Sequence, residues 1–96
     1  MATQPNAKLV KKYVEVSERH YPDGTVKPTA LWWTDGNLYR IDRILYSRPA
    51  ASHDVGGSGI LYQIMVKGKS RKLYYEELTN AYFVEADARY ADDAGD

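Results

Sequence analysis

The stretch LWWTDGNLYRIDRILY, residues 31–46, contains both tryptophans and the densest alternation of apolar and polar residues in the chain. At its centre, Asp35-Gly36 is a strong turn signal, because glycine enters the left-handed region without a steric penalty. Alternating residues on both sides of such a turn predict a β-hairpin. Ile41 and Ile44 are three residues apart and cannot face the same way in a regular strand, so the second strand of this hairpin is predicted to be bulged.

The loop length of this hairpin decides which residues face the core. A two-residue loop at Asp35-Gly36 would place Trp32 beside Tyr39 and Ile41. We favour a three-residue loop that ends at Gly36, because it gathers the large apolar residues on one face. These are Leu31, Trp33, Tyr39 and Ile41.

Outward from this hairpin, further short segments alternate with period two and are separated by turn signals. A strand over residues 8–21, with a helix as the weaker alternative, leads into the turn Tyr21-Pro22-Asp23-Gly24-Thr25. Pro28 favours an edge or a bulge in the next strand, residues 25–34. The remaining strands are residues 60–67, 70–78 and 81–86. Six short strands predict an all-β fold, a small curled antiparallel sheet or SH3-like barrel.

The hairpin over residues 60–78 is predicted to turn at Gly68-Lys69, with glycine first. This register pairs Val66 with Arg71, and places Met65 and Gln63 on the opposite face. On the face of Val66, this register also pairs Ile64 with Leu73 and Tyr62 with Tyr75. The predicted core comprises Val14, Val16, Trp33, Tyr39, Ile41, Tyr62, Ile64, Val66, Leu73, Tyr75 and Val84.

The 96 residues fit a single domain. We expect a disordered N-terminus over residues 1–7, one β domain over 8–86 and an acidic tail over 87–96. Residues 1–84 contain twelve Lys and Arg against eight Asp and Glu, whereas 85–96 contain one Arg against five acidic residues. There is no cysteine, no signal-like N-terminal segment and no long apolar run, so we expect a cytoplasmic protein without membrane association.

The pattern W-x-D-G-x-x-Y-x-I-D-x-I, from Trp33 to Ile44, is followed by RPAAS, a glycine-rich loop over 48–59 and a tyrosine-rich hairpin. This arrangement resembles small uncharacterised bacterial domains of unknown function, over about residues 13–86. The resemblance implies a compact bacterial β domain. It brings no catalytic residues that can be transferred to this chain.

Residues suited to catalysis or metal binding are few. The only histidines are His20, beside a turn, and His53, between Ser52 and Asp54 in the glycine-rich loop. A catalytic triad needs its three side chains in contact, which sequential neighbours on a loop rarely achieve. His20 with Asp23, or His53 with Asp54, supplies two candidate ligands, whereas structural zinc has four. The glycines of the loop lead into a strand, unlike those of a phosphate-binding loop. We therefore expect no enzymatic activity, cofactor or metal site.

Two binding roles remain. An exposed tryptophan near Leu38 or Tyr46 would suit a protein-interaction module, including a homodimer, and this is the favoured role. Cations interleaved with aromatic rings would instead suit single-stranded nucleic acid, the alternative role. The candidate contact surface for either partner comprises Trp32, Arg40, Arg43, Lys67, Lys69, Arg71, Lys72 and Tyr74.

Overall fold

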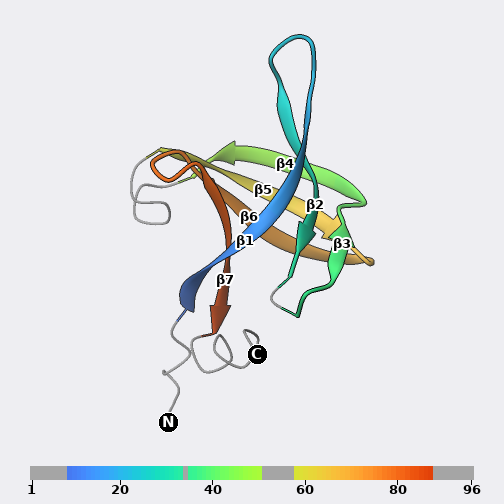
Figure 1. Ribbon diagram of the computed structural model, residues 1–96, viewed down its shortest axis with the longest axis vertical. Coiled ribbons are helices and arrows are strands. Elements are labelled where there is room, and N and C mark those ends of the chain that lie inside the picture. Colours follow the sequence, from blue (N-terminus) through green and yellow to red (C-terminus); the bar gives the residue numbers. More distant parts are fainter. Residues whose placement is uncertain (1–8, 34, 51–57, 88–96) are drawn as a thin grey trace.

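Seven antiparallel strands make up the fold in the computed structural model, which describes residues 9–33, 35–50 and 58–87 (Figure 1). They are β1 Leu9–His20, β2 Val26–Trp32, β3 Leu38–Arg40, β4 Arg43–Pro49, β5 Gly59–Val66, β6 Lys69–Glu76 and β7 Ala81–Asp87. Their order in the sheet is β3-β2-β1-β7-β6-β5-β4. The all-β, curled-sheet prediction is confirmed, and β1 is a strand rather than a helix. Residues 1–7 and all of the predicted acidic tail 87–96 except Asp87, which ends β7, lie outside the described residues.

The sheet curls into a half-barrel because β1 changes neighbour along its length. Residues 9–14 of β1 pair with β7, whereas residues 15–20 pair with β2. As a result, β1, β2 and β7 run across the direction of β4, β5 and β6 (Figure 1). The edge strands β3 and β4 are consecutive in the chain and are separated only by Ile41 and Asp42. The Ile41 N–H donates to the carbonyl of Thr29 (2.9 Å), and the Asp42 N–H donates to that of Met65 (2.8 Å). This corner divides the predicted third strand into two, which gives seven strands instead of six.

The hairpin loop between β2 and β3 has the favoured length of three residues. Leu31 lies opposite Tyr39, and the Trp33 N–H donates to the carbonyl of Asn37 (2.9 Å). Gly36 has a φ of 84°, in the left-handed region as predicted. Leu31, Trp33, Tyr39 and Ile41 all belong to one apolar cluster, so this prediction is confirmed.

The turn between β1 and β2 also follows its sequence. The Gly24 N–H donates to the carbonyl of Tyr21 (2.9 Å), Gly24 has a φ of 90°, and an Asp23 carboxylate oxygen accepts the Thr25 N–H (2.9 Å). The expected irregularity at Pro28 is present, because the β1–β2 register shifts between Ser17 and Glu18, beside Pro28.

The predicted register of the β5–β6 hairpin is wrong by two residues. The turn is Lys67-Gly68, both with positive φ (51° and 77°), so Val66 pairs with Lys69 instead of Arg71. Positive φ at both central residues is the type I′ geometry, which matches strand twist even though a lysine must enter the left-handed region. Because strand side chains alternate with period two, a shift of two residues leaves every side chain on its predicted face. The predicted core is therefore unaffected by the wrong register.

The main core lies on the face of the sheet that carries Leu73, which we call the inner face. Its buried members are Leu31, Ile41, Tyr62, Ile64, Val66, Leu73, Tyr82 and Val84. The other predicted core residues pack against them and are partly buried: Val14, Val16, Trp33, Tyr39 and Tyr75. Tyr82, which pairs with Val14 on the neighbouring strand, was not among the predicted core residues.

A second apolar cluster lies on the outer face and was not predicted. It comprises Leu61, Tyr74 and Phe83, and Phe83 has no exposed surface. The Tyr74 ring stacks on Phe83 (centroids 4.9 Å apart, planes at 6°), and the Tyr13 ring meets Phe83 edge-on at 5.7 Å. The Tyr74 hydroxyl donates to Glu85 (3.1 Å). Tyr74 is 4% exposed, so its expected place on a contact surface is wrong.

The long loop predicted over 48–59 begins later than expected. Arg48 and Pro49 belong to β4 and pair with Leu61 and Ile60 of β5. Proline is tolerated here because β4 is an edge strand and its partner lies on one side only. Residues 51–57, which include His53, lie outside the described residues.

Candidate binding site

The sheet opens between β6 and β7. β6 pairs with β5 over its whole length, from Lys69 to Glu76. With β7 it pairs only from Tyr74 to Glu76, because β7 beyond Phe83 continues alongside β1 instead. The first five residues of β6 therefore have a strand neighbour on one side only among the described residues. This divergence separates the two arms of the half-barrel and leaves a cavity between them.

The cavity has a volume of about 310 Å³ and combines apolar walls with a basic rim. Its apolar and aromatic walls come from both arms of the sheet: Leu31, Trp33, Tyr39, Ile64, Val66 and Val84. Its charged residues are Lys67, Lys69, Arg71 and Lys72, together with Asp35. We call this the basic-rimmed cavity. It brings together half of the eight residues proposed from the sequence as a contact surface.

The type I′ turn and strand alternation place the cations at the mouth. Lys69 and Arg71 alternate with Leu73 along β6 and so share its inner face. The Lys67 N–H donates to a carboxylate oxygen of Asp42 (3.0 Å), which ties the turn to the corner before β4. The Lys67 ammonium lies over the ring of Tyr39, with the nitrogen 5.1 Å from its centroid.

The single carboxylate at the rim is engaged by its own loop. Asp35 accepts the Asn37 N–H (2.8 Å) through one oxygen and the Tyr39 hydroxyl (2.9 Å) through the other. The hydrogen bond from the Asn37 backbone N–H, together with the one from the Tyr39 hydroxyl, holds the pKa of Asp35 below its usual range. The same carboxylate raises the pKa of the Tyr39 hydroxyl, which remains a donor. The mouth thus presents four cations against one carboxylate.

Two other candidate residues line a different hollow. Arg40 and Arg43, with Lys27 and Tyr21, belong to an open groove of about 780 Å³. Along β3, Leu38 and Arg40 line this groove, whereas Tyr39 between them lines the basic-rimmed cavity. The two hollows share no lining residue. The proposed contact surface is therefore divided, with four of its residues at the basic-rimmed cavity and two at the groove.

Trp32 lines neither hollow. It is partly buried and lies opposite Leu38 on β3, which is 55% exposed. The expected pairing of an outward tryptophan with Leu38 is present, whereas Trp33 packs on the core. Trp33, Tyr39 and Val66 were predicted as core residues only. Their second role as cavity walls depends on the opening between β6 and β7.

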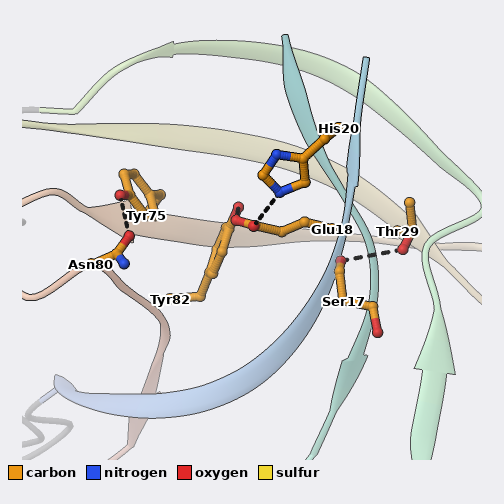
Figure 2. A network of polar contacts seen from close by, with 7 residues as sticks. All are labelled: Ser17, Glu18, His20, Thr29, Tyr75, Asn80 and Tyr82. Carbon is orange, nitrogen blue, oxygen red and sulfur yellow. Dashed lines mark hydrogen bonds and ion pairs between the residues drawn. The ribbon is translucent and has the colours of Figure 1, made fainter. Parts of the chain in front are cut away.

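A polar network joins the base of the β1–β2 hairpin to β7 (Figure 2). The Tyr82 hydroxyl donates to one carboxylate oxygen of Glu18 (2.6 Å), and the other oxygen lies 3.2 Å from the His20 Nε2. Burial and the Glu18 carboxylate raise the pKa of Tyr82, so its hydroxyl stays protonated and serves as a donor. Nearby, the Tyr75 hydroxyl donates to Asn80 (2.6 Å). We interpret this network as structural, since it satisfies the polar end of a core tyrosine.

Among residues 9–33, 35–50 and 58–87, neither a metal site nor a membrane-spanning helix was found, and no related protein was found that would assign a function to these residues. Within the described ranges, no group of three or more His, Asp or Glu side chains is placed to hold a metal ion. The described part of the chain also contains no helix long and apolar enough to cross a membrane. No family model, curated protein or solved structure matched this chain. The resemblance to small bacterial domains therefore stays a prediction.

Proposed function

We propose that this protein is a non-enzymatic protein-interaction module that binds an acidic segment of a partner through one apolar or aromatic anchor. The observation that carries the proposal is the basic-rimmed cavity, whose lining combines apolar and aromatic side chains with four cations. Binding energy in protein interfaces concentrates in anchors that fill desolvated pockets. Surrounding charges mainly set the association rate and the choice of partner. A cytoplasmic location is part of the proposal and rests on the absence of cysteine.

The size of the cavity favours a side-chain anchor over a free small molecule. Its volume of about 310 Å³ is at the lower end of the range for small-molecule sites, roughly 300–1,000 Å³. One aromatic side chain would cover Val84 and Ile64, while carboxylates beside it would reach Lys69 and Arg71. The anchor would enter between β6 and β7, where the two arms of the sheet diverge.

The test is fluorescence anisotropy with a labelled synthetic peptide that carries one phenylalanine flanked by glutamates. We expect binding that weakens with salt, because rim ion pairs are screened. Lys69→Glu with Arg71→Glu should weaken it at least tenfold. The matched control, Arg40→Glu with Arg43→Glu, makes the same change of charge in the groove and should have a much smaller effect. An equal loss of peptide affinity in both double variants would show that binding depends on net charge alone, which would contradict the proposal.

Single-stranded nucleic acid is the second candidate, and the open groove favours it. The groove is lined by Lys27, Arg40 and Arg43 with no carboxylate among its lining residues. The ring of Tyr21 at its end lies near Arg19 and Lys27 (5.1 and 5.7 Å to its centroid). A labelled oligonucleotide separates the candidates, because its steeply salt-dependent binding should fall with the Arg40 and Arg43 substitutions. No binding at low salt would exclude this candidate.

Self-association is a further form of the interaction role. Leu38 is 55% exposed beside the partly buried Trp32, which leaves an apolar spot on the outer face. Sedimentation at increasing protein concentration measures it directly. If this spot forms a homodimer, Leu38→Glu should convert a concentration-dependent mass into that of the monomer. A monomer mass at all concentrations would remove the homodimer from consideration.

A further inference from the structure

The cations of the basic-rimmed cavity have no carboxylate partner among the described residues. The ion pair of Lys11 with Glu76 and the contact of His20 with Glu18 involve no residue that lines this cavity. Asp35, the one carboxylate among the lining residues, accepts the Asn37 N–H and the Tyr39 hydroxyl, and the Asp42 carboxylate beside the turn accepts the Lys67 N–H. Four cations gathered at one mouth repel one another and favour a ligand that supplies negative charge.

The sequence supplies a segment of matching chemistry a few residues beyond the cavity wall. Val84 forms part of the cavity wall, and β7 ends three residues later at Asp87. The sequence then continues ARYADDAGD over 88–96, with one aromatic ring at Tyr90 and carboxylates at Asp92 and Asp93. This is the combination of an aromatic anchor and adjacent acidic residues that the cavity suits.

The length of the segment is sufficient for it to return to the cavity. From Val84 to Asp87 the strand rises about 10 Å, at roughly 3.3 Å per residue. A chain that reverses after Asp87 needs about three to six residues to come level with Val84 again. Tyr90, Asp92 and Asp93 lie three, five and six residues beyond Asp87. These three residues therefore cover the length of chain that is needed to come level with Val84 in the cavity wall.

We propose that the acidic segment 88–96 binds in the basic-rimmed cavity of its own chain, with Tyr90 against the apolar walls and Asp92 and Asp93 at the rim cations. This inference rests on the proposed function, because the segment would occupy the place of the partner. A tethered ligand has an effective concentration in the millimolar range, so even weak docking competes with an external peptide. The partner must displace the segment, which lowers its apparent affinity.

The experiment measures binding of the same glutamate-flanked phenylalanine peptide to two full-length proteins. One is the unaltered chain; the other, the tail variant, carries Tyr90→Ser, Asp92→Asn and Asp93→Asn. We expect the tail variant to bind about three- to tenfold more tightly, as an effective concentration near millimolar would give for weak docking. The charge control is Glu15→Gln with Glu77→Gln, which removes two exposed carboxylates elsewhere and should change the affinity less than twofold.

A second readout follows Trp33, which lines the cavity. In a Trp32→Phe background Trp33 is the only tryptophan, and its emission should shift with added salt in the unaltered chain but not in the tail variant. Equal peptide affinity of both proteins would overturn docking while leaving the proposed function intact. No peptide binding by either protein would overturn both proposals. A salt-sensitive dimer mass would show that the segment binds a second copy, which also overturns docking within one chain.

Discussion

Replacement of Phe83 by leucine tests whether the outer face of the sheet has a core of its own. Phe83 is fully buried and makes two aromatic contacts, a stack on Tyr74 and an edge contact from Tyr13. The Lys11 ammonium also lies 4.9 Å from its ring centroid. Each aromatic pair contributes about 0.5–1.5 kcal/mol beyond burial, and the cation about 0.5–1 kcal/mol. Leucine retains most of the apolar burial, so Phe83→Leu should cost about 2–3 kcal/mol.

Urea unfolding, followed by tryptophan fluorescence and circular dichroism, measures this cost. With a slope of about 1 kcal/mol per molar urea, the midpoint should fall by about 2–3 M. Such a loss is a large part of the roughly 5–15 kcal/mol typical of a folded domain. Tyr46→Leu is the matched control, because Tyr46 is 50% exposed and should cost under about 0.5 kcal/mol. A loss under about 1 kcal/mol in Phe83→Leu would refute the interpretation of a second core.

Two further substitutions test the hydrogen bonds around Glu76 on the outer face and the loop between β2 and β3. Glu76, which accepts hydrogen bonds from Lys11 (2.6 Å), Tyr13 and Thr79, has a pKa lowered to about 2, from 4.5. The stabilisation by the ionised Glu76 carboxylate is full above about pH 4.5 and is lost as the pH falls towards 2. Between about pH 6 and pH 3 the urea midpoint should therefore drop less in Glu76→Gln than in the unaltered protein. Equal drops in the two proteins would contradict this explanation. Gly36→Ala should lower the free energy of unfolding by only about 1–2 kcal/mol, since the added Cβ meets no atom within 4 Å and only the left-handed φ is unfavourable. A decrease of more than about 3 kcal/mol in the free energy of unfolding, measured by urea denaturation, would contradict that explanation.

Local features of the fold were predictable because nearby residues enforce them. Asp35-Gly36 and Asp23-Gly24 each combine a carboxylate that bonds to the backbone with a glycine at positive φ, and both turns form as expected. Strand alternation then identified the inner core. The Lys67-Gly68 turn was misassigned because a lysine takes a conformation that sequence rules reserve for glycine or asparagine.

The candidate site was predictable in part. The four cations near the β5–β6 turn are close in sequence, so their proximity followed from the hairpin itself. Arg40 and Arg43 were separated from them because β3 presents alternate residues to different hollows. Tyr74 was misplaced because Phe83, from another strand, covers its ring. Alternation along a single strand gives the face of a residue but says nothing of what packs against that face.

The sequence by itself determined the strands, most turns and the composition of the inner core, since these depend on residues within a few positions of one another. Only the tertiary structure decided where the sheet opens. β7 leaves β6 after the pair Tyr74–Phe83 and continues with β1, and this exchange of neighbours creates the basic-rimmed cavity. Pairing between strands far apart in sequence depends on the twist and curl of the whole sheet, which no local pattern encodes. The same core residues therefore become cavity walls through the arrangement of distant strands.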